Sequence, residues 1–296
     1  MNKANNNLYG LVFDSLNYII LTLLLILTVY PFYYIFIYSI SDAVLAQKGI
    51  VFLPAGFSLK TYIGVFKLRG IPNAALVSLL RTLIGTVLTV GCSAFFAYLV
   101  TKKELFLRKV IYRFVIISMY FNAGFIPWYI TMKALGLKNN FMLYVLPSAV
   151  IAFYVILIKT FIEQLPQSLE ESARIDGAGY IKVFAKIIFP ISMPIIATIM
   201  VFSAVGQWNS WIDNFFLVEN PDLMTLQLIL YQFLSQANAI ASRSMQELSR
   251  GILVKTLTPQ SIKMGITMVV TLPVLMVYPF MQRYFIKGIM LGAVKG

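Results

Sequence analysis

The segment LPQSLEESARIDGAGYIKVFAKIIFP, residues 165–190, puts charged and turn-forming residues between long apolar runs. Ser168 is followed three residues later by Glu171, which predicts a capping box that satisfies unpaired amides at a helix start. Gly177 is placed to end that helix in a left-handed turn. A helix of about two turns, about 12 Å long, is marginal alone in water and needs a surface. The segment therefore predicts a short helix that rests either on this protein's inner face or on a soluble partner.

The apolar runs around this segment are long enough to cross a bilayer. A hydrocarbon core about 30 Å thick needs about 20 apolar helical residues to span it. The first run is too long for a signal peptide and lacks a well-placed small-residue cleavage site. The sequence thus predicts an all-α, polytopic membrane protein with six transmembrane helices. The six stretches are residues 16–40, 75–100, 110–130, 141–161, 187–205 and 264–286.

The composition agrees with a membrane protein. Of 296 residues, 59% are hydrophobic and 12% charged, and the mean hydropathy is +0.82. Soluble domains average about 25% charged residues, so an ordinary cytoplasmic enzyme is disfavoured. Lys and Arg number 24 against 11 Asp and Glu, but they lie between apolar runs rather than in a nucleic-acid-binding patch. With one cysteine (Cys92) and no histidine, disulfides, cysteine-cluster metal sites and histidine catalysis are excluded.

Orientation and domain boundaries follow from the loops. Basic residues crowd the loops after the second and fourth spans and the C-terminal tail, whereas the loop of residues 131–140 has only two. The positive-inside rule then places both termini in the cytoplasm. Residues 41–74 are expected to form a folded outer segment, and residues 220–262 to contain a short outer helix. We divide the chain into residues 1–74, one span plus the outer segment, and a transmembrane core of residues 75–296 that includes the segment of residues 165–190.

The segment of residues 165–190 resembles the EAA loop of ABC importer permeases. That family pattern reads Glu-Ala-Ala, three residues, Gly, nine residues, Ile, any residue, Leu-Pro. Here Glu171-Ser172-Ala173, Gly177, Ile187 and Phe189-Pro190 keep the spacing, with Ser for Ala and Phe for Leu. The neighbouring Asp176-Gly177-Ala178 is also similar to the carbohydrate-uptake (maltose-type) class. The resemblance implies the type I importer transmembrane fold and a coupling helix that docks on an ATP-hydrolysing subunit, with these contact residues: Glu170, Glu171, Ser172, Ala173, Asp176, Gly177 and Pro190.

A second resemblance covers residues 121–147 and the C-terminal YFIKGIMLGAVKG. These stretches look like permeases for larger oligosaccharides, such as alginate or pectin fragments. The likeness implies a multi-pass protein of the bacterial cytoplasmic membrane that moves oligosaccharides inward. It also implies four partners besides the bilayer: a second homologous permease, two ATPase subunits and an extracytoplasmic sugar-binding protein. No G-x-x-x-x-G-K-[ST] motif is present, so ATP and Mg²⁺ would lie on the ATPase subunits and this chain itself would hold no cofactor.

Candidate residues of the substrate path combine aromatic rings with amide and carboxylate groups, which suit sugar faces and hydroxyls. Many Trp and Tyr residues at this depth instead form an interfacial belt, and that reading stays open for each ring. Asp213 is the strongest candidate, since acidic residues near a bilayer usually face protein or water. The candidates are Trp208, Asn209, Trp211, Asp213 and Asn214 after the fifth span, and Tyr120, Asn122, Trp128 and Tyr129 on the third.

Two further features concern the spans themselves. Arg81, about two turns into the second span, is expected to snorkel toward the outer headgroups rather than line the path. Five prolines are expected to kink their helices: Pro31, Pro127, Pro147, Pro194 and Pro273.

Two alternatives to the oligosaccharide permease remain. The first is an ABC permease for another solute, since the coupling loop does not identify the cargo. The second is an autonomous ion-coupled secondary transporter. Such transporters usually carry ionisable relays deep within their spans. Here no acidic residue lies within a predicted span, and Arg81 is the only basic residue more than a turn from a span end.

Overall fold

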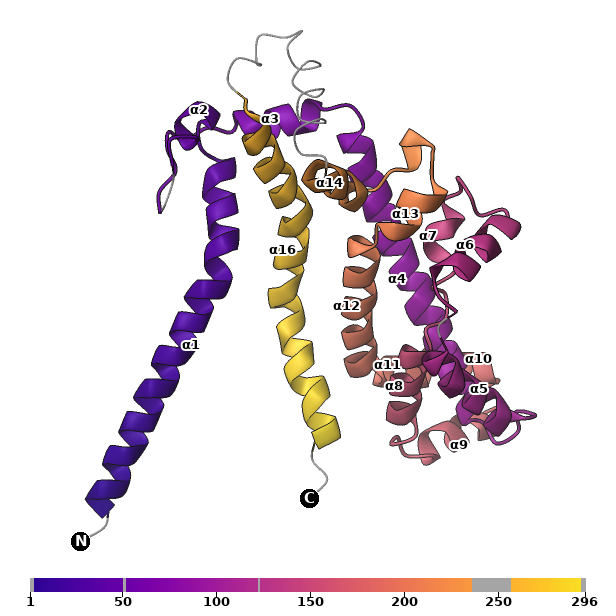
Figure 1. Cartoon of the computed structure of the whole chain (residues 1–296). Helices are drawn as coiled ribbons and strands as arrows, with labels where there is room; N and C mark the ends of the chain where they lie inside the picture. Colours follow the sequence, from indigo (N-terminus) through magenta and orange to yellow (C-terminus); the bar gives the residue numbers. More distant parts are fainter. Residues whose placement is uncertain (1–2, 50–51, 122, 236–256, 294–296) are drawn as a thin grey trace. The chain divides into compact units, whose positions relative to one another are not determined.

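The computed structural model describes residues 3–49, 52–121, 123–235 and 257–293. In these ranges the chain is helical, without β-strands beyond one isolated bridge between Ser41 and Phe57 (Figure 1). It divides into two compact units: residues 1–69 with 232–269, and residues 70–231 with 270–296.

The first unit begins with α1 (Lys3–Ser39), followed by α2 (Ala43–Ala46) and α3 (Lys60–Lys67). From Gly10 onward α1 is apolar, and no residue of its most apolar 18-residue stretch is buried against protein. Such an all-round apolar helix suits a lipid environment. Asp42 caps α2 by accepting hydrogen bonds from two backbone amides. The segment after α1 therefore contains a short capped helix.

The second unit contains a run of shorter helices around one long helix. In chain order these are α4 (Ile71–Thr101), α5 (Arg108–Tyr120), α6 (Phe125–Ala134), α7 (Met142–Val145), α8 (Ala152–Ile162), α9 (Ser168–Ile175), α10 (Tyr180–Val183), the π-helix η1 (Phe184–Ile188), α11 (Phe189–Ile191), α12 (Met193–Asn209), α13 (Ile212–Leu217), the 3-10 helix η2 (Pro221–Leu223) and α14 (Leu226–Ser235). The last helix, α16 (Pro259–Ala293), and α14 each have residues in both units.

Helix α4 is the axis of the second unit, and α8 and α12 pack along it. Two apolar clusters lie at its two ends. One joins Ala94, Ala97 and Tyr98 of α4 to buried residues of α8 and α12. The other joins Val77 to the region of α6, α7 and α13. Figure 1 shows α9 and α10 at one end of the unit and α6, α7 and α13 at the other.

Only part of the six-span prediction appears as continuous helices. Among the described residues, three helices are long and apolar enough to cross a bilayer. These are Gly10–Ser39, Ile71–Thr101 and Pro259–Val277. A fourth candidate is the pair Tyr180–Ile191 and Met193–Asn209, which is bent by 84°.

Neither the predicted third span nor the predicted fourth span is a single continuous helix. The third is broken before α6 at Gly124, whose φ of +84° suits glycine but disfavours other residues. The fourth is broken around Pro147, between α7 and α8. Pro194 lies just after the bend that precedes α12, whereas α1 continues through Pro31.

Side chains of α4 satisfy the backbone where the fourth span is broken. The Thr89 hydroxyl donates to the carbonyl of Ser148 at 2.7 Å. The Ser93 hydroxyl accepts from the amide of Ile151 at 3.2 Å. Water is absent from a hydrocarbon core, so non-helical backbone persists there only when protein groups satisfy it. The polar face of α4 is therefore what permits the break.

We predict that Gly85→Val destabilises the second unit, because a Cβ on Gly85 would stand 2.7 Å from the side-chain amide of Gln207 on α12. Overpacking of this kind typically costs about 1–3 kcal/mol. The measurement is the thermal unfolding midpoint of the purified protein in detergent. Gly91→Val is the matched control, since a Cβ at Gly91 of the same helix meets nothing within 4 Å. Equal midpoints for the two variants would contradict the close approach of α4 and α12.

Candidate functional site

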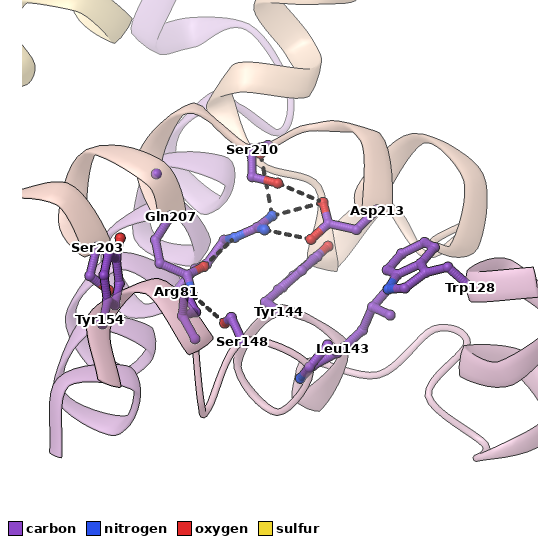
Figure 2. Close-up of a pocket in the computed structure, with 13 residues that line it drawn as sticks. Arg81, Trp128, Leu143, Tyr144, Ser148, Tyr154, Ser203, Gln207, Ser210 and Asp213 are labelled. Atoms are coloured by element: carbon purple, nitrogen blue, oxygen red, sulfur yellow. Dashed lines mark hydrogen bonds and ion pairs between the residues drawn. The ribbon is translucent and has the colours of Figure 1, made fainter. Parts of the chain in front are cut away.

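A cavity of about 300 Å³ lies in the second unit, between α4, α7, α8 and α12 (Figure 2). Its wall combines hydroxyl, amide and charged groups with aromatic rings. Such a mixture can hydrogen-bond a polar solute and also cover an apolar face. The lining residues are Arg81, Trp128, Leu143, Tyr144, Pro147, Ser148, Ile151, Tyr154, Ser203, Gly206, Gln207, Ser210 and Asp213.

Arg81 and Asp213 form a bidentate ion pair in the wall of this cavity. Nη1 of Arg81 donates to Oδ1 of Asp213 at 3.1 Å, and Nη2 donates to Oδ2 at 2.5 Å. Arg81 is 3% exposed and Asp213 8% exposed. The predicted snorkelling of Arg81 toward headgroups is therefore wrong, because a buried carboxylate within reach gives the guanidinium a stronger partner than the interface does.

Polar neighbours complete the coordination of the pair. Nε of Arg81 donates to Oε1 of Gln207 at 3.2 Å, and Nη1 also donates to the carbonyl of Ser210 at 3.3 Å. The other end of the Gln207 amide donates to the Ser148 hydroxyl at 2.8 Å. The guanidinium carbon stands 4.5 Å from the centre of the Tyr144 ring. One network thus ties α4, α7, α12 and α13 together around the cavity.

Asn214 does not line the cavity but binds Tyr144, which does. It has no exposed surface, and its amide nitrogen donates to the Tyr144 hydroxyl at 2.5 Å. Its oxygen accepts from the backbone amide of Thr225 at 3.0 Å, just before α14. The structure therefore places Asn214 as a link between α7, α13 and α14, away from the cavity surface.

The predicted residues after the fifth span are dispersed rather than gathered on one surface. The indole N–H of Trp208 donates to the carbonyl of Val270 at 2.9 Å. Trp211 stacks on Tyr231, with ring centres 3.9 Å apart and an interplanar angle of 15°. Asn209 is exposed. Of the predicted set after the fifth span, Asp213 alone lines the cavity.

Of the described candidates on the third span, Trp128 lines the cavity, but Tyr120 and Tyr129 do not. Trp128 lines the cavity and is half-buried, whereas Tyr120 is 82% exposed. Tyr129 is half-buried and lies beside Phe125, with ring centres 6.3 Å apart. Asn122 lies outside the described residues.

Most residues of the cavity wall were not predicted from the sequence as parts of a substrate path. They include Tyr144, Ser148, Tyr154, Ser203 and Gln207. A usable signal was present on α4, where polar or small residues recur every three or four positions: Ser78, Arg81, Gly85, Thr89 and Ser93. That spacing puts them on one helix face. A polar face in an apolar helix indicates a protein-facing or solute-facing side.

The predicted coupling helix is α9 at the opposite end of the unit. Its N-cap residue is Gln167 without a side-chain cap, so the capping box of Ser168 and Glu171 is wrong. The helix starts one residue earlier than that motif requires, and backbone carbonyls of Pro166 and Gln167 serve its first amides. The helix ends at Gly177 as predicted, with φ of +79°.

The C-terminal turn of α9 is a Schellman motif. The amide of Ala178 donates to the carbonyl of Ala173, and the amide of Gly177 donates to that of Arg174, both at 3.0 Å. This turn redirects the chain into α10, η1 and α11, where Pro190 lies before the 84° bend into α12.

Charged side chains fasten α9 to the adjacent end of α4. Glu170 forms an ion pair with Lys102 and accepts from the Tyr98 hydroxyl at 3.0 Å. Arg174 donates to Glu104 at 2.9 Å. The hydrogen bond from Arg174 holds the pKa of the exposed Glu104 carboxyl below its usual value, so this ion pair remains charged near neutral pH.

The other face of α9 is open. Glu171, Ser172 and Asp176 are exposed, and Ile175 is 86% exposed. Glu170 and Ala173, by contrast, are half-buried. The two adjacent glutamates therefore have different surroundings: Glu170 anchors the helix and Glu171 points outward. Among the described residues there is no cluster of His, Cys, Asp and Glu that could hold a metal ion.

The chain is similar to known transport proteins over nearly its whole length. Residues 11–291 match the family model described as binding-protein-dependent transport system inner membrane component. The chain is 35% identical over 286 residues to the polygalacturonan/rhamnogalacturonan transport system permease protein YtcP of Bacillus subtilis, covering 96% of this chain and 99% of that protein. It is 37% identical over 300 residues to protein LplC of Bacillus subtilis, covering 100% and 99%.

The fold is also similar to a solved structure. One chain of a bacterial ABC transporter involved in the import of the acidic polysaccharide alginate superposes with a TM-score of 0.86 and 26% identity. The match covers 96% of this chain and 99% of that chain. The likeness extends over the α9 end and the cavity end of the second unit.

We predict that Asp213→Asn lowers the yield and thermal midpoint of the folded protein, because it leaves the Arg81 guanidinium buried without a counter-charge. Breaking a buried pair in this way costs about 3–5 kcal/mol. The double variant Arg81→Gln, Asp213→Asn should recover much of that loss. Glu219→Gln, which breaks the exposed pair with Lys138, should leave the midpoint unchanged. An Asp213→Asn protein with the yield and thermal midpoint of the wild type would contradict this structural role.

Proposed function

The chain belongs to the family of binding-protein-dependent transport system inner membrane components, and on that basis we propose that it is the permease subunit of an ATP-driven oligosaccharide importer. The named sugar and polysaccharide substrates of its relatives support this cargo class. The chain would provide one half of a transmembrane path, and the energy would come from a separate ATPase.

The observation that carries the proposal is the divided surface of α9. One face is fixed to α4 through Glu170 and to the loop after α4 through Arg174. The other face leaves an apolar side chain, Ile175, in the open beside the exposed carboxylate of Glu171. An exposed large apolar residue on a short, anchored helix suits a docking contact with a partner protein.

The anchored face explains how such a partner could act on the path. A displacement of α9 would be transmitted to α4 through the Glu170–Lys102 ion pair and the Tyr98 hydrogen bond. A second route runs through α10, η1 and α11 to the bend before α12. Helices α4 and α12 both line the cavity. ATP-driven movement of the partner would therefore reshape the cavity from the opposite end of the unit.

The proposed complex contains two ATPase subunits that bind ATP and Mg²⁺, a second homologous permease and an extracytoplasmic sugar-binding protein. In this arrangement the chain spans the cytoplasmic membrane six times, with both termini in the cytoplasm. The broken pairs α5–α6 and α7–α8 each take the place of one span. Glu171, Ser172 and Asp176 would contact the ATPase, and Gly177 would permit the turn.

The autonomous ion-coupled alternative gains no support from the ionisable groups of the second unit. A proton relay needs a group that can change its charge state during transport. The buried carboxylate of Asp213 instead receives two guanidinium hydrogen bonds and the backbone amide of Asn214. Those contacts tie the carboxylate to Arg81 and to the backbone of α13, so it belongs to the structural network of the cavity wall.

We predict that Glu171→Ala reduces ATP-driven uptake by at least about tenfold, because it removes a charged contact on the docking face while leaving the anchoring face of α9 intact. The measurement is uptake and ATP hydrolysis by the complex reconstituted in vesicles, together with recovery of the ATPase on affinity-tagged chain. Glu163→Ala is the control, since Glu163 is an exposed cytoplasmic-side glutamate that pairs with Lys159 outside α9. Wild-type uptake by Glu171→Ala, or purification of the folded chain without any ATPase, would refute the coupling role.

A further inference from the structure

We propose that the Arg81 cavity is a binding subsite for one neutral sugar ring of the transported solute, with the Arg81–Asp213 pair as its hydrogen-bonding group. This inference rests on the proposed import function and adds a location, a stoichiometry of one ring and a charge preference.

The size and opening of the cavity suit a single ring. At about 300 Å³ it lies at the small end of solute pockets. Gly206 of α12 is part of its wall, and a Cβ built on Gly206 would meet nothing within 4 Å. Open space therefore stands directly against the α12 backbone, where a bound ring can approach closely.

The wall offers the hydrogen bonds that a ring with several hydroxyls needs. The hydrogen bonds of Arg81 within the protein occupy Nε, both hydrogens of Nη1 and one hydrogen of Nη2, which leaves a second Nη2 hydrogen for a solute oxygen. The carboxylate of Asp213 retains acceptor capacity beyond its protein contacts. The guanidinium can thus donate to one hydroxyl of a vicinal diol while the carboxylate accepts from the other.

An aromatic ring completes the site. Trp128 of α6 lines the cavity on the side away from Tyr154 and Ser203, with Arg81 between them (Figure 2). The axial C–H bonds of a sugar ring form an apolar face, and the face of an indole is the usual surface against which it packs. A wall with one aromatic ring and one diol-binding ion pair is therefore complementary to a solute ring that has a polar edge and an apolar face.

The charge balance of the cavity selects a neutral ring over a uronate. Among the residues that the structure describes, Arg81 and Asp213 are the only charged ones in the wall, and their charges cancel. A solute carboxylate would lose its hydration without meeting a net positive charge, and it would stand close to the Asp213 carboxylate. A ring with an uncharged CH₂OH or CH₃ at its C6 position neither buries a charge nor places one beside the Asp213 carboxylate.

The test fills the cavity in steps through Gly206→Ala, Gly206→Val and Gly206→Leu. Gly91→Leu is the matched control, because it makes the same helical substitution into open space outside the cavity wall. The purified membrane complex, without its binding protein, is probed by saturation-transfer NMR with three neutral disaccharides, galactobiose, cellobiose and melibiose. Digalacturonate, which differs from galactobiose by its C6 carboxylates, is the charged probe.

We expect at least one neutral disaccharide to bind the wild-type complex more tightly than digalacturonate does. We expect its affinity to fall stepwise across the series, by about tenfold or more in Gly206→Leu, while Gly91→Leu matches the wild type. Preferential binding of digalacturonate, or no neutral binding at all, overturns the charge preference. Neutral binding that is unchanged in Gly206→Leu overturns the location. Recovery of the ATPase with Gly206→Leu tests the import function separately, so the two proposals can fail independently.

Discussion

In a hydrocarbon environment, backbone that leaves a helix must find hydrogen-bond partners within the protein, and the second unit meets this requirement through one face of α4. Thr89 and Ser93 satisfy the backbone between α7 and α8. One or two turns toward the N-terminus of α4, Gly85 admits Gln207 and Arg81 binds Asp213. If that face were apolar, the fourth span could not break there, and the cavity wall that the break supplies would not exist.

The same helix links the cavity to the docking surface. Arg81 lies in the N-terminal half of α4, and Tyr98 and Lys102 lie at its C-terminal end against Glu170 of α9. A helix of 31 residues is about 46 Å long and transmits an axial or rocking displacement with little bending. Binding at the cavity and docking at α9 therefore act on one rigid element, which is a physical basis for coupling between them.

The buried ion pair has consequences for both stability and solute choice. Arg81 and Asp213 are strongly attracted in a medium of low dielectric constant, but each also loses its hydration, so the pair adds little net stability. Its value lies in specificity, because it fixes α13 against α4 and presents a donor and an acceptor side by side without net charge. Such a wall favours hydroxyl groups over carboxylates as ligands.

The sequence by itself determined the helical membrane class and the position of α9, the helix proposed here to dock on the ATPase, because apolar length, loop charge and the Glu171 to Pro190 spacing are local properties of the chain. The end of α9 at Gly177 is likewise local, since a left-handed turn favours glycine. The tertiary structure alone decided that Arg81 faces a carboxylate instead of headgroups and that Asn214 is buried. It also decided that two spans are broken. Each depends on partners far away in sequence, and no local pattern can specify which distant side chain will satisfy a buried charge or an open backbone amide.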